Sequence, residues 1–192
     1  MPELKKHIIE TFGFTESEFQ EIKPFFKRKE ILKGDYFLKE GQYVREMGFV
    51  EKGIFREFLY INEKEVTKWF STSGYFAVDL SGFLFDQTSK VNFQAITDVE
   101  LLTISKENYN NISTRVPRWN ELEKMFLAKC FRVLENRVIS HLALSAEERY
   151  HQLFAFTPTL FNKVPLNQIA SMLGMSAETL SRIRKKQTKS TS

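Results

Sequence analysis

Residues 164–186 read VPLNQIASMLGMSAETLSRIRKK, and apolar side chains recur in them three and four positions apart on both sides of Gly174. This spacing predicts two short helices joined by a tight turn. Glycine tolerates the left-handed backbone that ends a helix, and the hydroxyl of Ser176 can accept a free N–H of the helix that follows. The small Ala170 would let the two helices cross closely. The segment is therefore typical of a helix, a turn and a second helix.

The second predicted helix needs only Leu180 and Ile183 for packing, so its other side chains should face outward. The candidate contact residues on and beside this face are Ser176, Ala177, Glu178, Thr179, Ser181, Arg182, Lys185 and Lys186. Several of them are cationic, which favours an anionic partner.

The order of these residues resembles the DNA-binding helix-turn-helix motif, whose second helix enters the major groove while the first crosses the backbone. The positions that the motif constrains are filled by Ile169, Ala170, Leu173, Gly174, Met175, Leu180 and Ile183. The resemblance implies that the outward face binds duplex DNA. The alternative is an αα-hairpin that only covers a core.

Charge is divided unevenly along the chain. Residues 114–192 hold 13 Lys and Arg against 6 Asp and Glu, a balance of +7, whereas residues 1–113 hold 15 against 18, a balance of −3. The net charge of +4 therefore hides a strongly basic C-terminal part. Such an excess of cations is the electrostatic footprint expected of a phosphate-binding surface.

Length and composition exclude several classes of protein. With 192 residues, 42% of them hydrophobic, the chain can bury a core and is not a disordered protein. No apolar run reaches the roughly 20 residues of a membrane span and the N-terminus lacks a signal pattern, so we expect a soluble cytoplasmic protein without a membrane partner. Cys130 is the only cysteine and should be a small buried hydrophobe, and the three His are isolated, so no metal site is predicted.

The N-terminal part has the pattern of a small β-structure. From about Phe25 to Ile104, short runs rich in β-branched and aromatic residues alternate with turn signals, which favours an antiparallel roll. Before them, residues 4–11 predict a short amphipathic helix, and Thr15 with Glu18 has the pattern of a capping box. After them, residues 106–113 predict another short helix.

A long helix without internal Pro or Gly is predicted from Pro117 to about Leu144. It carries two apolar stripes at three-to-four spacing. The first stripe is Trp119, Leu122, Phe126, Cys130 and Val133, and the second is Leu127, Phe131, Leu134, Val138 and Leu142. One stripe suffices to pack the helix against its own domain, so the second predicts a partner, most simply the same helix of another subunit in a parallel coiled coil. The alternative is that both stripes are buried within one subunit.

These elements predict an α+β fold in three parts. Residues 1–113 should form a β-roll that senses an effector, residues 114–144 the long dimerisation helix, and residues 145–192 a helix-turn-helix domain. Within the last part, Ser145 is placed to cap a helix that runs to about Phe156, and Pro158 ends it.

This order of parts resembles the catabolite activator and fumarate–nitrate regulator (Crp/Fnr) family of bacterial transcription factors over essentially the whole chain. The most specific match is residues 178–183, ETLSRI, which resemble the recognition helix of that family. The resemblance implies that Glu178 and Arg182 contact base edges, that a homodimer binds a pseudo-palindromic duplex operator, and that RNA polymerase is a partner. The chemistry agrees, because Arg can donate to guanine and Glu can accept from cytosine.

Two features depart from the family pattern. Ala177 stands where the family has Arg, which implies a different base preference. Few residues follow the recognition helix, so the domain at residues 145–192 is expected to lack most of the β-hairpin wing that is familiar in the family.

The cyclic-nucleotide-binding members of the family hold their ligand with a Gly-Glu pair at the ribose and an Arg-Ser pair at the phosphate. The flanking residues place Val78-Asp79 and Ser89-Lys90 at these positions, so a carboxylate is kept but the guanidinium is missing. The effector pocket implied by the resemblance is Phe76, Val78, Asp79, Leu80, Ser89 and Lys90, with Phe83 and Phe85 as further candidates for an apolar wall. No cofactor is predicted, the effector is unknown, and cyclic AMP is not expected to bind tightly.

The leading hypothesis is a homodimeric, sequence-specific transcriptional regulator. The alternative is a ligand-binding signalling module whose basic C-terminus docks protein or RNA, and the complete helix-turn-helix pattern favours the first. No Gly-x-Ser-x-Gly elbow, phosphate-binding Gly loop or HExxH helix is present, so an enzyme is not predicted.

Overall fold

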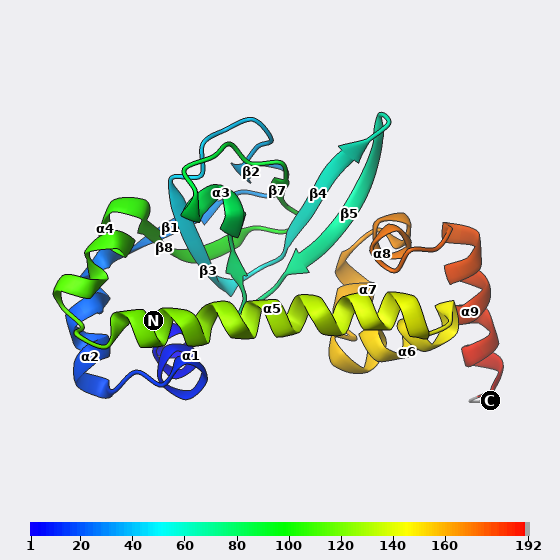
Figure 1. Ribbon diagram of the computed structural model, residues 1–192. Coiled ribbons are helices and arrows are strands. Elements are labelled where there is room, and N and C mark those ends of the chain that lie inside the picture. The colour runs from blue at the N-terminus through cyan, green and yellow to red at the C-terminus, as the bar shows by residue number, and fades with distance from the viewer. Residues whose placement is uncertain (191–192) are drawn as a thin grey trace. The chain divides into compact units, whose positions relative to one another are not determined.

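The computed structural model describes residues 1–190, with side chains up to Lys186, and has the predicted α+β architecture (Figure 1). The chain divides into two compact units. The first unit consists of residues 1–59 and 70–130, and the second consists of residues 60–69 and the chain from Phe131 onward. The predicted division into residues 1–113, 114–144 and 145–192 stays a prediction.

Two helices precede the sheets. They are α1 (Pro2–Phe12) and α2 (Glu16–Ile22), followed by a 3₁₀ turn, η1 (Lys23–Phe25). The hydroxyl of Thr15 accepts the N–H of Glu18 at 3.2 Å, and the Glu18 carboxylate accepts the N–H of Thr15 at 2.7 Å. The predicted capping box is therefore confirmed, because each residue satisfies a free N–H of the other.

The strands of the described residues form two four-stranded sheets with the orders β1-β8-β3-β6 and β2-β7-β4-β5. Their bounds are β1 (Phe26–Ile31), β2 (Tyr36–Leu38), β3 (Glu46–Lys52), β4 (Phe55–Ile61), β5 (Lys64–Ser71), β6 (Phe76–Ala77), β7 (Asn92–Ala95) and β8 (Val99–Ser105). β8 pairs antiparallel with β1 and β3, and β7 pairs antiparallel with β2 and β4. The predicted antiparallel roll is confirmed.

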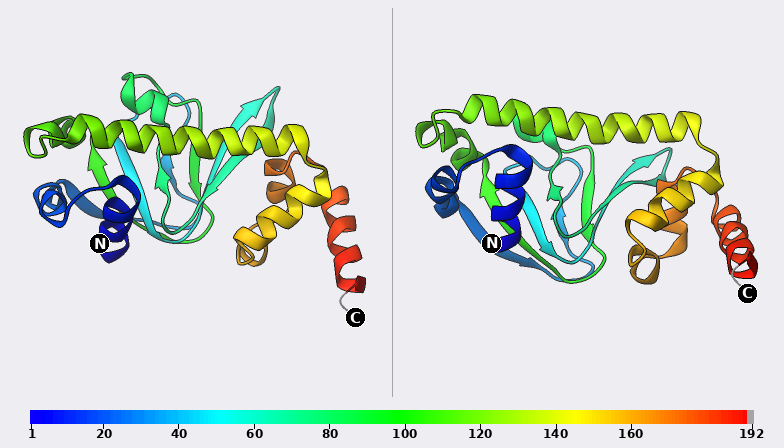
Figure 2. Two further views of the ribbon diagram at one scale, coloured as in Figure 1. Left: turned by 60° about the horizontal axis from the view of Figure 1, so that its bottom comes forward. Right: turned by 90° about the horizontal axis from the view of Figure 1, so that it is seen from below.

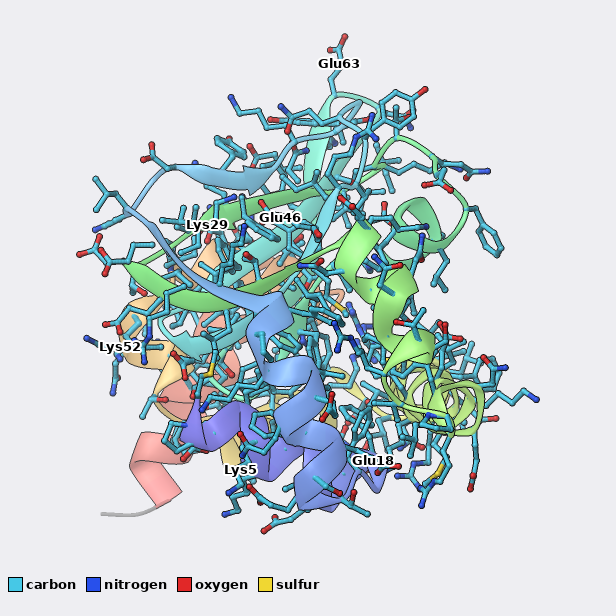
Figure 3. All side chains as sticks on the ribbon, turned by 90° about the vertical axis from the view of Figure 1, so that its left-hand side faces the viewer. Lys5, Glu18, Lys29, Glu46, Lys52 and Glu63 are labelled. Carbon is cyan, nitrogen blue, oxygen red and sulfur yellow. The ribbon has the colours of Figure 1, made fainter. Side chains whose placement is uncertain are left out.

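The core of the first unit is built from apolar side chains of both sheets. Phe49 of β3, Phe55 of β4 and Phe93 of β7 are fully buried in it. Other charged residues of the sheets lie nearer the surface, and Lys29 of β1 forms an ion pair with Glu46 of β3 (Figure 3). This division between apolar and charged positions is the pattern of sheets that bury one face.

The long helix α5 (Trp119–Ala143) follows a short helix, α4 (Lys106–Asn110), and a 3₁₀ turn, η2 (Asn111–Thr114). α5 begins two residues later than predicted. Pro117 lies in a turn closed by a hydrogen bond from the N–H of Trp119 to the carbonyl of Val116 at 2.9 Å, so the helix starts only after that turn.

The first apolar stripe of α5 packs into the first unit, next to α1 and α2 (Figure 2). Trp119, Leu122 and Phe126 are buried, and each such side chain stabilises the fold by about 1.5–3 kcal/mol. Cys130 is half-buried against the same core, and burial raises the pKa of its thiol, as suits a small hydrophobe. Val133 was predicted in this stripe but is half exposed, because the core of the first unit ends at Cys130.

The second apolar stripe of α5 is exposed along most of its length. Leu127 packs against the core, but Phe131, Leu134, Val138 and Leu142 are exposed by 65%, 55%, 50% and 82%. The two stripes are therefore not both buried within one chain.

Four helices form the C-terminal part of the second unit. They are α6 (Ala146–Phe156), α7 (Leu160–Lys163), α8 (Leu166–Met172) and α9 (Ala177–Ser190). Ser145 caps α6, and α6 ends before Pro158, both as predicted; Glu148 completes a capping box with Ser145. The unit also includes the end of the β4–β5 hairpin, where Asn62 and Glu63 turn the chain with positive φ angles and Glu63 extends outward (Figure 3).

Candidate nucleic-acid interface and effector cassette

α8 and α9 are joined by the turn that the sequence predicted. Gly174 has φ of +66°, a left-handed conformation that L residues rarely adopt. The N–H of Met175 donates to the carbonyl of Ala170 at 3.0 Å and the N–H of Gly174 to the carbonyl of Ser171 at 3.1 Å. These bonds satisfy carbonyls at the end of α8, so a side chain at Gly174 would strain the turn.

The start of α9 is capped as predicted. The hydroxyl of Ser176 accepts the N–H of Thr179 at 3.2 Å. Ile169 and Ala170 of α8 and Leu180 and Ile183 of α9 are buried, which holds the two helices together through their apolar sides. The helix-turn-helix arrangement is therefore present.

The other side of α9 faces solvent. Of the predicted contact residues, Ser176, Ala177, Glu178, Arg182, Lys185 and Lys186 are exposed, whereas Thr179 and Ser181 are half-buried. The Arg182 guanidinium donates to the Thr179 hydroxyl at 3.2 Å, one turn back toward the start of the helix. The backbone N–H of Glu178 and the hydroxyl of Ser176 bond to the Glu178 carboxylate and, with the charge of Arg182, lower its pKa, so it stays ionised.

Lys186 forms an ion pair with Glu147, a residue that the sequence analysis did not connect with it. Its ammonium lies 3.1 and 3.2 Å from the two carboxylate oxygens of Glu147, in the first turn of α6. The signal could not be read from the sequence, because 39 residues separate the two. Any phosphate contact by Lys186 has to compete with this ion pair.

The predicted effector residues near α3 (Leu80–Leu84) form a closed hydrogen-bond network around Asp79, the N-cap of that helix. One carboxylate oxygen of Asp79 accepts the hydroxyl of Ser81 at 2.9 Å and the N–H of Gly82 at 3.3 Å. The other accepts the hydroxyl of Ser89 at 3.0 Å and the N–H of Lys90 at 3.2 Å. All four donors therefore come from residues 81–90, the segment that follows Asp79; we call residues 76–90 the effector cassette.

This network also determines the charge of Asp79. Burial raises the pKa of its carboxyl, but the hydrogen bonds from Ser81, Lys90, Gly82 and Ser89 together outweigh burial and leave the pKa below its usual value. The carboxylate is consequently ionised at neutral pH and already has its acceptor positions occupied.

The other predicted pocket residues lie in different surroundings. Val78 and Leu80 are partly buried against the core, and the side chain of Lys90 is exposed. Phe76 packs away from Asp79, with its ring 5.2 Å from that of Phe49 and 5.6 Å from that of Phe126. Phe83 is fully buried and Phe85 is largely exposed. The structure therefore brings together Asp79, Ser89 and the backbone of Lys90, but not Phe76.

An apolar cavity of about 40 Å³ lies in the first unit, away from the Asp79 network. It is bordered by residues of α1, α2, the sheets and α5, among them Phe12, Phe76, Trp119, Leu122 and Phe126. Phe76 is thus a cavity-lining residue, but at a different place from the one predicted.

Sequence reasoning missed two buried charges in β4. Arg56 and Glu57 are 4% and 6% exposed, and the hydroxyl of Ser71 donates to the Glu57 carboxylate at 2.5 Å. Charged residues in a short strand predict a solvent-exposed face, so no local signal pointed to their burial.

Two features that the described residues lack bear on the site. No cluster of three or more His, Cys, Asp and Glu side chains is arranged to hold a metal ion. Among the described helices, none has the length and apolar character needed to cross a membrane.

Residues 28–115 match the family of the cyclic nucleotide-binding domain. Three solved structures share the fold over most of the chain. They are the catabolite activator protein of Thermus thermophilus (TM-score 0.58, 21% identity, 96% of this chain and 87% of that chain), FixK2 of Bradyrhizobium japonicum (0.69, 15%, 86% and 85%) and the c-di-GMP-responsive global regulator CLP of Xanthomonas campestris (0.64, 17%, 92% and 93%).

The chain has the fold of the Crp/Fnr regulators. The predicted resemblance is thereby confirmed for the fold, and the match to the cyclic nucleotide-binding domain covers most of the β-roll. The chain spans only about two fifths of the length of the cAMP-bound kinase regulatory chains that it also matches. No curated protein matches the sequence.

The matched residues 28–115 contain the Asp79 network, and this network makes a prediction about stability. Asp79→Ala removes a buried helix cap and takes the acceptor from the N–H groups of Gly82 and Lys90, so the free energy of unfolding should fall by about 1–3 kcal/mol. Urea denaturation measures the loss, and Asp35→Ala, at an exposed aspartate of the same domain, should change it little.

The free energy of unfolding should also depend on pH differently in wild type and in Asp79→Ala. The pKa of Asp79 is lower in the folded than in the unfolded chain, where it is about 3.9. The ionised carboxylate therefore stabilises the fold fully above about pH 3.9, and this stabilisation is lost as the pH falls through the folded-state pKa. The stability gap between wild type and Asp79→Ala should therefore narrow in acid. A gap that is constant down to unfolding would contradict the network.

Proposed function

We propose that the protein is a homodimeric, sequence-specific DNA-binding regulator of transcription. The observation that carries the proposal is the helix-turn-helix, whose second helix exposes Glu178 and Arg182 on one face while Leu180 and Ile183 pack it from the other. Arg is the side chain best suited to guanine in the major groove, and Glu can accept from cytosine.

Charge supports duplex DNA as the partner. The chain from Thr114 onward has a balance of +7, and Arg182, Lys185 and Lys186 are exposed on α9. A recognition helix with cations along its exposed face can bind phosphates on both sides of the groove. A generic basic tail that docks protein or RNA has no need for the glycine turn or for the buried positions of α8 and α9.

The exposed stripe of α5 supports a dimer. Phe131, Leu134, Val138 and Leu142 recur every three or four residues, which is the spacing of a coiled-coil seam. Two copies of α5 side by side would remove this stripe from water and place two recognition helices in one molecule. Such a dimer fits a pseudo-palindromic operator. RNA polymerase is the further partner that regulators of this fold imply.

The effector cassette is proposed to be degenerate. Solved proteins with this fold include a c-di-GMP-responsive regulator and cAMP-bound kinase chains, so the fold accommodates different ligands. In this chain, Val78 and Asp79 stand at the ribose position and Ser89 and Lys90 at the phosphate position. The Asp79 carboxylate already accepts hydrogen bonds from Ser81, Ser89 and Lys90, and neither Ser89 nor Lys90 carries a guanidinium.

Cyclic AMP is therefore expected to bind weakly or not at all. Its phosphate would lose a bidentate, charge-assisted contact, and its ribose would have to displace donors from Asp79. Isothermal titration calorimetry of the full chain checks this, and a micromolar dissociation constant would contradict the proposed cassette. Ser89→Arg restores one guanidinium and should strengthen binding if the missing clamp is the main obstacle.

Selection from random duplex DNA tests the proposed function directly. A homodimeric regulator should enrich a symmetric site, with half-sites about one helical turn apart. Enrichment of no symmetric site would leave the docking of protein or RNA as the better account of the basic C-terminus.

A further inference from the structure

Three consecutive residues at the end of α8 each accept a hydrogen bond from a different element of the second unit. The Ser171 hydroxyl accepts the N–H of Thr67 in β5 at 3.0 Å. The Met172 carbonyl lies 3.3 Å from Nε2 of His141 in α5, and the Leu173 carbonyl accepts Nε–H of Arg149 in α6 at 2.9 Å. We call Ser171, Met172 and Leu173 the α8 end.

The donor residues lie in segments that further contacts hold in place. Arg149 also donates from Nη1 to the carbonyl of Leu144 at 2.7 Å, so one guanidinium joins the end of α5 to the α8 end. The other ring nitrogen of His141, Nδ1, lies 3.0 Å from the carbonyl of Arg137 in the preceding turn of α5, so the ring lies between two carbonyls. Thr67 is 1% exposed, and the Arg137 guanidinium of α5 lies 5.2 Å from the ring centre of Trp69 on the same strand.

These three bonds are not needed to hold α8 against α9. The buried side chains Ile169 and Ala170 of α8 and Leu180 and Ile183 of α9 already do so. The α8 end instead connects the helix pair to α5, to α6 and to the hairpin. Carbonyl groups at a helix end usually bond to water. Bonds from three separate elements therefore do more than satisfy the end of α8, because they also fix the orientation of the helix pair.

We infer that the α8 end sets the direction of the recognition helix relative to the exposed stripe of α5, and that Arg149, His141 and Ser171 are positioning residues for operator binding. The inference rests on the proposed function. A dimer gains affinity from its second half-site only if the two recognition helices are held at the right separation and direction. Loosening the α8 end should consequently weaken binding to two half-sites more than binding to one.

The test compares Arg149→Met with Ser171→Ala, separately and combined, in the full chain. Arg149→Met keeps an aliphatic stem but removes both guanidinium bonds. Ser140→Ala is the matched control, because the Ser140 hydroxyl donates to Gln152 at 2.9 Å and so joins α5 to α6 without touching the α8 end. Each protein is titrated with the selected symmetric duplex, with a duplex in which one half-site is scrambled, and with one carrying two extra base pairs between the half-sites.

The combined variant should bind the symmetric duplex roughly tenfold more weakly and bind the single half-site within about twofold of wild type. Insertion of two base pairs should cost this variant less affinity than it costs wild type, because its helices are less firmly directed. Ser140→Ala should match wild type on all three duplexes. Equal losses on one and two half-sites would overturn the inference, since they would mean that the substitutions damage the helix pair itself.

Hydrogen exchange supplies a readout that needs no DNA. Ser171→Ala removes the acceptor of the Thr67 N–H, so exchange of that amide should accelerate by about fivefold or more, and Ser171→Thr should restore protection. Unchanged exchange at Thr67 would overturn the inference on its own. Absence of sequence-specific binding by wild type would refute the proposed function instead, so the two failures are distinguishable.

Discussion

Leu134→Lys should convert a dimer into a monomer. Leu134 lies in the middle of the exposed stripe of α5 and is itself 55% exposed in the single chain. In a parallel pair of helices it would face its copy across the seam, so the substitution would place two ammonium groups in an apolar interface. An unpaired charge at the centre of an interface costs several kcal/mol, enough to shift a micromolar dimer to monomer.

Analytical ultracentrifugation at micromolar concentration measures the effect. Asn136→Lys is the matched control, because residue 136 is exposed on the same helix but belongs to neither apolar stripe. It adds the same charge and should leave the dimer intact. A monomeric wild type, or a Leu134→Lys variant that still dimerises, would show that the exposed stripe has another partner.

The elements predicted well from the sequence are those fixed by neighbours in the chain. The capping box at Thr15 and the helix cap at Ser145 involve residues three positions apart, and the turn at Gly174 needs one glycine between two periodic runs. The second apolar stripe of α5 could also be predicted, because a period of three and four residues depends only on local spacing.

The elements that could not be predicted depend on distant partners. The donors to Asp79 include Ser89 and Lys90, ten and eleven residues away, and nothing in a local pattern indicates that they fold back onto one carboxylate. The contact of Thr67 with Ser171 spans 104 residues. The resemblance placed Phe76 in a pocket with Asp79, but the packing of α1 and α5 against the sheet drew its ring into the core.

These long-range contacts also change what should be expected of the recognition helix. Lys185 and Lys186 are adjacent in the sequence and were both predicted to bind phosphates, yet Lys186 is paired with both oxygens of Glu147. A phosphate must replace that carboxylate before Lys186 can contribute to binding. The sequence alone gives no sign of this competition, because Glu147 lies 39 residues before Lys186.

Arg182→Ala should weaken binding to the selected duplex by about 1–3 kcal/mol, roughly tenfold to a hundredfold, and relax specificity at one base position. The physical reason is the loss of a side chain that can donate two hydrogen bonds to one guanine. Duplexes of unrelated sequence should be affected much less, because the change removes base readout more than general attraction to phosphate.

Lys185→Ala should behave in the opposite way, weakening binding to all duplexes alike and lowering the slope of log K against log salt by about one. Lys186→Ala should lower the slope by less than one, because the Lys186 ammonium is already paired with the Glu147 carboxylate. Titrations at several salt concentrations, with selected and unrelated duplexes, measure both quantities. If Arg182→Ala and Lys185→Ala behave identically on both duplexes, α9 does not read bases, and its cations act only as a basic surface.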